Sequence, residues 1–152
     1  MILKINKDPF LDDDYLDLQY RQLTPTIEQV ISICKEGTQA VMGEQEGKQF
    51  SIDVNEIFYI EWVDKRSCIC TASEVYTTPL TLSQLEQQLE QKGFVRISKP
   101  ILVNVYKVKW VSSGLNMKLA AQLVNGENVG ISRHYRDGLL NAIYSLGKEF
   151  SR

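Results

Sequence analysis

The side chains whose type and spacing suggest a definite chemistry are cations in short polar segments that interrupt or follow apolar stretches. Three segments hold them: Lys65-Arg66-Ser67, Ser98-Lys99-Pro100 and Arg133-His134-Tyr135-Arg136. Lysine and arginine neutralise phosphate groups, and arginine can also donate two parallel hydrogen bonds to the edge of guanine. Seryl and backbone groups can add contacts to phosphate oxygens. These residue types therefore suit the binding of a polyanion at several separate points.

The distribution of charge supports this reading, although the chain has a formal net charge of −2. Residues 1–61 hold 5 Lys and Arg against 12 Asp and Glu, whereas residues 62–152 hold 12 against 7. Within residues 94–136 there are seven basic residues and a single acid, Glu127. An acidic protein thus contains a local cationic stretch that a polyanion would attract, with an ordinary solvated basic surface as the alternative.

The other reactive side chains do not form a catalytic or metal-binding set. The three cysteines follow no repeating pattern, and an odd number argues against a disulfide scaffold. Cys68 and Cys70 share one face of any strand, where we interpret them as small buried groups, with a metal pair or a redox switch as the alternative. The only histidine, His134, stands among arginines without an acid partner. We therefore expect no enzyme activity, no metal ion, no cofactor and no small-molecule substrate.

Length and composition are those of a globular protein. The chain has 152 residues, of which 43% are hydrophobic and 24% are charged. No apolar run approaches the roughly 20 residues that span a bilayer. Residues 1–9 mix apolar and charged side chains and contain no signal-peptide core. A cytoplasmic protein is the resulting expectation.

The first 44 residues predict a small, acidic β/α layer. Residues 2–7 and 15–21 alternate between polar and apolar side chains, as half-buried strands do. Thr24 and Pro25 mark the start of a helix, and Gly37 marks its end. A strand through residues 39–43 would close this layer.

Residues 45–152 predict a body that is mostly β with α, an α+β fold of antiparallel sheets with flanking helices. Strands are expected over residues 48–54, 57–63, 67–71, 75–78, 94–97, 101–104, 108–111 and 118–124. Leu82, Leu85 and Leu89 recur at helical spacing, with Thr81 or Ser83 as the cap and Gly93 as the end. Asn125-Gly126 predicts a two-residue hairpin turn, and a last helix is expected from about Tyr135.

Residues 55–136 resemble a LytTR-type DNA-binding domain. Four segments carry the resemblance in the order of the family. Ile57-Phe58-Tyr59-Ile60-Glu61 resembles its opening strand, and Leu80 to Leu89 resembles the short helix after the hairpin. Phe94 to Asn104 is similar to the signature in which an aromatic-rich strand enters a polar bend and ends in Val-Asn. Ile131-Ser132-Arg133-His134-Tyr135 resembles the closing motif.

The resemblance implies an elongated fold that places loops, not a recognition helix, into successive major grooves of double-stranded DNA. It implies a sequence-specific transcriptional regulator. The DNA-contacting residues are then expected to be Lys65, Arg66, Ser67, Ser98, Lys99, Lys107, Lys109, Arg133, His134 and Arg136. Among these, we expect Arg66 and Arg133 to reach base edges, and the lysines and Arg136 to hold phosphates. Two positions depart from the family pattern: Lys99 replaces an amide or serine, and His134 replaces an arginine.

The resemblance also implies a homodimer, or paired monomers, on repeated DNA sites. Residues 1–44 are too short for a receiver domain and are expected to serve in dimerisation or in receiving a signal. A small membrane protein is the partner that the family suggests. The alternative function is a protein-interaction module that a partner tethers or silences. We expect Asn104 to form a turn rather than to contact DNA, and Trp62 and Trp110 to pack in the core or an interface.

Overall fold

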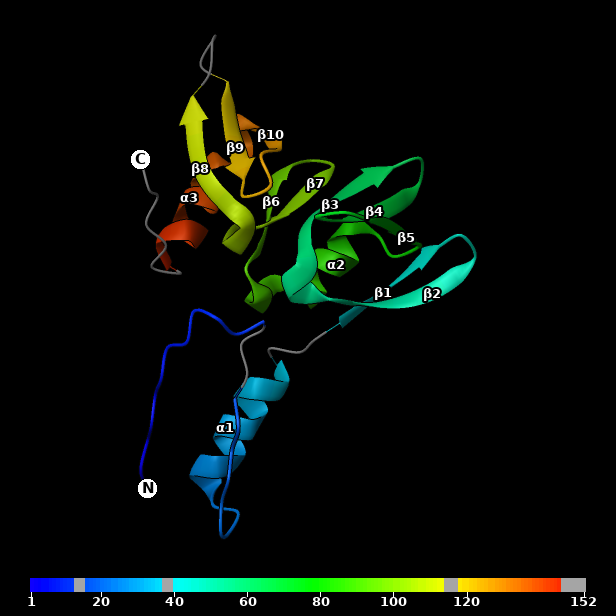
Figure 1. The fold of residues 1–152 in the computed structure, drawn as a ribbon. Helices are drawn as coiled ribbons and strands as arrows, with labels where there is room; N and C mark the ends of the chain where they lie inside the picture. Colours follow the sequence, from blue (N-terminus) through cyan, green and yellow to red (C-terminus); the bar gives the residue numbers. More distant parts are fainter. Residues whose placement is uncertain (13–15, 37–39, 114–117, 146–152) are drawn as a thin grey trace. The chain divides into compact units, whose positions relative to one another are not determined.

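The computed structural model describes residues 1–12, 16–36, 40–113 and 118–145 of the chain (Figure 1). The chain divides into two compact units, residues 1–36 and residues 37–152. No helix in the described ranges is long and apolar enough to cross a membrane.

Within its described residues, the N-terminal unit contains one helix, α1 (Pro25–Glu36). Its predicted start is confirmed, since Oγ1 of Thr24 accepts a hydrogen bond from the Ile27 amide at 3.3 Å. The predicted stop at Gly37 falls outside the described residues. Neither of the strands predicted over residues 2–7 and 15–21 is formed within residues 1–12 and 16–24. An alternating pattern yields a strand only where a neighbouring strand completes its hydrogen bonds. In the described residues, neither of these two segments pairs with a strand.

The second unit is built on a seven-stranded antiparallel sheet with the order β2-β1-β5-β4-β3-β7-β6. Its strands are β1 (Ala40–Gln45), β2 (Lys48–Asp53), β3 (Ile57–Val63), β4 (Arg66–Thr71), β5 (Val75–Thr78), β6 (Phe94–Ser98) and β7 (Ile101–Asn104). Strand β1 pairs with β2 along its whole length and with β5 through Glu44 and Thr77. The sheet thus includes β1, most of which was predicted to belong to the N-terminal layer.

One face of this sheet packs against helix α2 (Leu82–Gln88). The helix begins with a capping box: Oγ1 of Thr81 accepts from the Gln84 amide, and the Gln84 side chain accepts from the Thr81 amide. The apolar stripe of the helix, with Leu85 fully buried, packs against Ile60, Ile69 and Leu102. Full burial of each such side chain stabilises the fold by about 1.5–3 kcal/mol.

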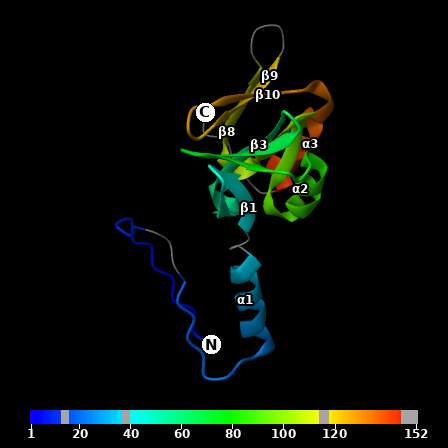
Figure 2. The same cartoon turned by 90° about the vertical axis from the view of Figure 1, so that its right-hand side faces the viewer.

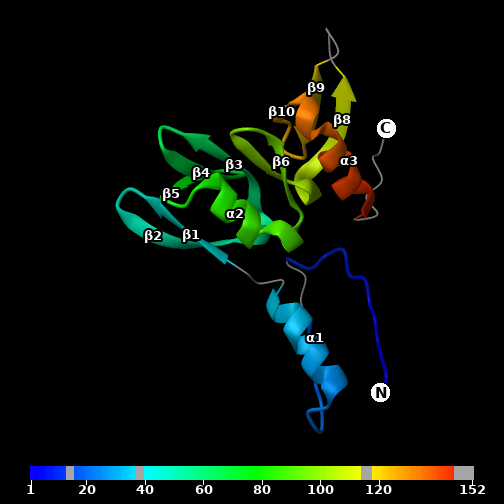
Figure 3. The same cartoon turned by 180° about the vertical axis from the view of Figure 1, so that it is seen from behind.

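The opposite face is covered by a three-stranded antiparallel sheet and by helix α3 (Arg136–Ser145). The strands, in the order β10-β9-β8, are β8 (Val108–Ser113), β9 (Leu119–Leu123) and β10 (Asn128–Ile131). Figure 2 shows them gathered at the upper end of the unit, and Figure 3 shows α3 beside them. Leu139 and Ile143 of α3 join a second core cluster with Ile97 and Val103. The predicted mostly-β fold of antiparallel sheets with helices is therefore confirmed.

The hairpin turns differ in geometry. Asp64 and Lys65, between β3 and β4, both have positive φ, at 50° and 64°. This matches a two-residue type I′ turn, which follows the twist of its strands. The predicted hairpin at Asn125-Gly126 is present, but its loop has three residues rather than two. The Gly126 amide bonds to the Leu123 carbonyl, and the Leu123 amide bonds to the Glu127 carbonyl.

Candidate nucleic-acid interface

Two of the predicted cationic segments lie at the same end of the seven-stranded sheet. Strand β7 runs beside β3, with Ile101 opposite Glu61. The Trp62 amide donates to the Pro100 carbonyl at 2.8 Å, so the β6–β7 turn sits against the last residues of β3. The β3–β4 turn that contains Lys65 begins two residues later. Lys65, Arg66 and Lys99 therefore extend from neighbouring strands at one end of the sheet.

The third cationic segment joins them through β6. The Ser132 amide donates to the Ile97 carbonyl at 2.8 Å, which places the end of β10 beside the last residues of β6. Arg133 and His134 follow at once, in the short 3-10 turn η5 (Arg133–Tyr135), and Arg136 begins α3. Two main-chain hydrogen bonds thus bring together three segments that are far apart in the sequence.

The cations of these segments face solvent. Lys65, Arg66 and Lys99 are exposed, as are the three basic residues of the closing segment. In the described part of the chain none of them takes part in an ion pair, and the ring of His134 only contacts that of Tyr135, at 5.3 Å between centroids. Their charges are consequently available to an external anion.

Both serines that were predicted to contact DNA are turned inward. Ser67 is fully buried, and its Oγ donates to the Leu80 carbonyl at 2.7 Å, which ties β4 to the segment before α2. The Oγ of Ser98 is buried and has no hydrogen-bond partner among the described residues. Alternation along a strand explains the direction of Ser67, because Ser67 lies next to exposed Arg66 and so points to the other face.

Lys107 and Lys109 are not brought to this end of the sheet. They follow Asn104, at the opposite end of β7, where the Val105 amide donates to the Gly93 carbonyl at 2.8 Å. The Nζ of Lys107 lies 5.2 Å from the centre of the Phe58 ring, and the Nζ of Lys109 lies 4.8 Å from that of Trp110. Aromatic rings attract such ammonium groups, so both lysines have partners within the protein.

The predicted turn-forming role of Asn104 is confirmed. Its side chain is buried, the amide nitrogen donates to the Ile57 carbonyl at 2.8 Å, and Oδ1 accepts from the Tyr106 amide at 3.1 Å. Trp62 packs against the α2 core cluster, as expected. Trp110 is 36% exposed and packs only in part.

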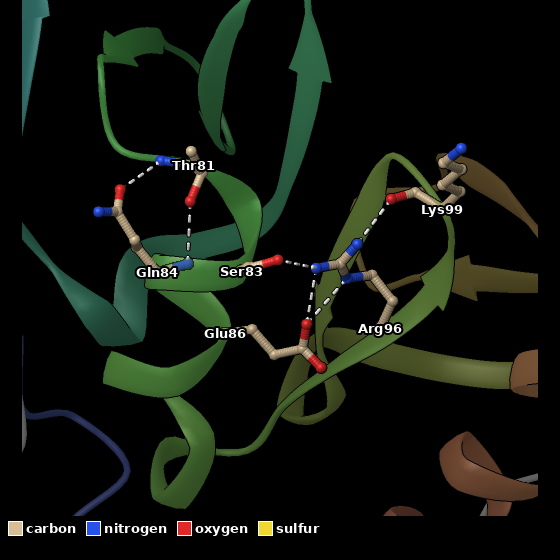
Figure 4. Close-up of polar contacts among 6 residues, drawn as sticks. All are labelled: Thr81, Ser83, Gln84, Glu86, Arg96 and Lys99. Carbon is tan, nitrogen blue, oxygen red and sulfur yellow. Dashed lines mark hydrogen bonds and ion pairs between the residues drawn. The ribbon is translucent and has the colours of Figure 1, made fainter.

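Sequence reasoning missed Arg96, which lies beneath the β6–β7 turn (Figure 4). Its Nε and Nη2 donate to Oε2 of Glu86 at 3.0 and 2.7 Å, and Nη1 donates to the Lys99 carbonyl at 2.7 Å. Nη2 also lies 3.5 Å from Oγ of Ser83. Arg96 is one of the seven basic residues within 94–136, but its ion pair with Glu86 neutralises its charge.

Cys68 and Cys70 are poorly suited to bind a metal ion. Burial raises the pKa of the Cys70 thiol to about 11, and burial followed by the charges of Glu61 and Asp64 raises that of Cys68. The thiolate is the form that binds metals and attacks electrophiles, so protonated thiols favour the packing interpretation. Burial also raises the pKa of the Tyr59 phenol. In the described residues no cluster of three or more potential metal ligands occurs.

Comparison with known proteins connects this geometry with one family. Residues 47–144 match the model of the LytTr DNA-binding domain. A sensory transduction protein LytT from Bacillus anthracis is 27% identical over 84 residues, which are 55% of this chain and 34% of the relative. The LytT protein of Enterococcus faecalis is 24% identical over 98 residues, 64% of this chain and 40% of that protein. The chain thus spans two fifths or less of the length of these curated relatives.

A solved structure shares the fold. It is described as a LytTr DNA-binding domain from Bacillus cereus, and it superposes with a TM-score of 0.65 at 20% sequence identity. The match covers 70% of this chain and 98% of the solved chain.

Proposed function

The chain belongs to the LytTR DNA-binding domain family, whose model matches residues 47–144, and on that basis we propose that it is a sequence-specific transcriptional regulator that binds double-stranded DNA. The observation that carries the proposal is the meeting of three exposed cationic segments at one end of the sheet, through the Trp62–Pro100 and Ser132–Ile97 hydrogen bonds. A polyanion placed there would meet unpaired positive charge from all three.

Within this surface, Arg66 and Arg133 are proposed to read base edges, because a guanidinium can donate two parallel bonds to guanine. Lys65, Lys99 and Arg136 are proposed to hold phosphates, and His134 to lie against the backbone beside them. Ser67 is left out because its hydroxyl is buried and already bonded. Lys107 and Lys109 lie apart, so we expect them to contribute less, through phosphates alone.

We propose that the turns enter the major groove and contact the edges of the bases there. Two of the segments are hairpin turns, and the third is a 3-10 turn followed by Arg136, the first residue of α3. A tight hairpin fits within the roughly 12 Å width of the major groove. Successive turns along one end of a sheet could then enter successive grooves.

We further propose a homodimer on repeated sites in the cytoplasm, with the N-terminal segment in assembly or signal reception. Nine large hydrophobic side chains in the N-terminal unit are at least 49% exposed: Met1, Ile2, Leu3, Ile5, Phe10, Leu16, Tyr20, Leu23 and Ile33. Exposed apolar groups in such number favour association with another surface. In the alternative function, a signalling module, a membrane protein controls the domain. That partner would bind the same N-terminal residues. Analytical ultracentrifugation of the full chain and of a chain without residues 1–36 tests this assignment, since only the former should dimerise.

The decisive experiment is binding of the full chain to duplex DNA at several salt concentrations, preceded by selection of bound fragments from a random pool. We expect an enriched sequence, and an affinity that falls steeply as salt rises, because bound cations release condensed counterions. Lys48→Ala is the matched control, since Lys48 is an exposed cation on the edge strand β2. It should leave the affinity unchanged, whereas Lys65→Ala should lower it. Absence of salt-sensitive binding to any duplex would refute the proposal.

A further inference from the structure

We propose that Arg96 is a positioning residue for DNA binding: it fixes the β6–β7 turn to helix α2 and so holds Lys99 in the orientation that contacts phosphate. This inference rests on the proposed function. Arg96 itself is not expected to touch DNA, because its guanidinium is already bonded to Glu86 and to the turn.

The β6–β7 turn needs external support. Ser98 pairs with Ile101, so Lys99 and Pro100 form a two-residue connection. Neither has positive φ, unlike Asp64 and Lys65 in the β3–β4 turn. The connection is therefore neither of the primed turns that match the twist of a hairpin. Pro100 in addition disfavours the αR conformation at Lys99 that an ordinary type I turn requires there.

Both carbonyls of this turn accept hydrogen bonds from elsewhere. The Pro100 carbonyl accepts from the Trp62 amide at 2.8 Å, a main-chain bond to β3. The Lys99 carbonyl accepts from Nη1 of Arg96 at 2.7 Å, a side-chain bond that substitution can remove. Arg96 thus holds one of the two anchoring points of the turn.

The guanidinium is itself held firmly. Two of its nitrogens donate to the same carboxylate oxygen of Glu86, and its side chain is 16% exposed. Charge-assisted bonds of this kind are short and directional. A lysine at position 96 could reach either Glu86 or the Lys99 carbonyl, but its single ammonium is poorly shaped to bridge both.

The bridge lies at an open surface pocket and not in the closely packed core. The pocket has a volume of about 410 Å³, and the residues that line it include Trp62, Leu82, Arg96 and Pro100. Figure 4 shows the Lys99 side chain projecting away from the cluster while its carbonyl faces Arg96. Loss of Arg96 would therefore leave the Trp62–Pro100 bond as the hydrogen bond that still anchors the turn.

The test is a double-mutant cycle in the full chain, with affinity for the selected duplex as the readout. Lys99→Ala and Arg96→Gln should each lower the affinity, by roughly three- to tenfold for one charged contact. The double variant should be no weaker than the weaker single variant, because both changes remove the same contact. Arg96→Gln combined with Lys65→Ala should instead multiply the two losses, since Lys65 is held by a different turn.

Arg96→Lys separates positioning from general stabilisation. We expect it to keep the ion pair with Glu86 and most of the melting temperature, yet to bind DNA as weakly as Arg96→Gln. Two results would overturn the positioning role: wild-type affinity in Arg96→Lys, or losses that multiply when Arg96→Gln is combined with Lys99→Ala. In both cases the wild-type chain still binds DNA. Failure of the proposed function is distinct, because the wild-type chain would then not bind.

Discussion

The side-chain amide of Asn104 donates a hydrogen bond of 2.8 Å to the main-chain carbonyl of Ile57, and so joins the end of β7 to the beginning of β3. The same side chain accepts from the Tyr106 amide and caps the short turn after β7. A residue that is 2% exposed thus satisfies two main-chain groups from different parts of the chain.

Replacement of Asn104 by alanine should therefore destabilise the fold. The Ile57 carbonyl would lose the hydrogen bond from this side chain, at a cost of about 1–3 kcal/mol for a buried group left unsatisfied. Urea unfolding of Asn104→Ala and of Asn128→Ala, an exposed asparagine of β10, measures the difference. At a temperature where both variants are folded, Asn104→Ala should keep its DNA affinity. A loss of affinity without a loss of stability would favour a direct contact with DNA.

A second prediction concerns the close approach of strands at Gly43. A Cβ at this position would lie 2.7 Å from Cδ1 of Ile52 and 2.8 Å from Cβ of Tyr76. The Tyr76 atom is fixed to the main chain, so Gly43→Ala should destabilise by about 1–3 kcal/mol.

Gly138→Ala provides the matched control for this change. Gly138 lies in α3, and a Cβ there would meet nothing within 4 Å. Alanine favours helix over glycine, so this variant should gain about 0.5–1 kcal/mol. Melting temperatures that shift in the same direction in both variants would contradict the packing argument.

A third prediction is a loss of stability in alkaline solution. Burial raises the pKa of Cys70 from its ordinary value of 9.0 to about 11 in the folded protein. Between these values the unfolded chain releases the proton and the folded chain retains it, so stability falls as pH rises from 9 to 11. Urea unfolding at pH 8 and pH 10.5 should show this fall, and Cys70→Val should reduce it. Cys34→Ser is the control because that thiol is exposed, and equal falls in all three proteins would exclude Cys70 as a source.

The parts of the fold that local chemistry determines could be predicted from the sequence. The leucines of α2 and its cap at Thr81 are set by neighbours within four residues, and both are observed. The strands predicted over residues 2–7 and 15–21 are not formed, because strand formation depends on partners that the local pattern cannot reveal. The strand near residue 40 was expected, but its place between β2 and β5 depends on pairing over long distances.

In the candidate site, too, some features follow from the local sequence and others depend on long-range packing. The positions of Lys65 and Lys99 in turns follow from turn-forming residues beside them. The inward direction of Ser67 depends on register, and a shift of one residue would have exposed it. Arg96 could not be recognised as a partner of Glu86, because ten residues separate them and only the packing of α2 against β6 brings them together.

The last prediction separates base reading from phosphate binding. If Arg133 donates to a base edge, Arg133→Ala should weaken binding to the selected site by about 1–3 kcal/mol and relax the preference at one position. Lys65→Ala, a phosphate contact in the proposal, should weaken selected and random duplexes alike and lower the salt dependence of binding. Affinities for the selected duplex and for single-base variants of it measure both effects. The Ser132–Ile97 bond places Arg133 beside the β6–β7 turn. The base pair at which Arg133→Ala relaxes the preference should therefore lie next to the phosphate that Lys99 contacts. Equal losses for Arg133→Ala on selected and random duplexes would assign Arg133 to the backbone instead.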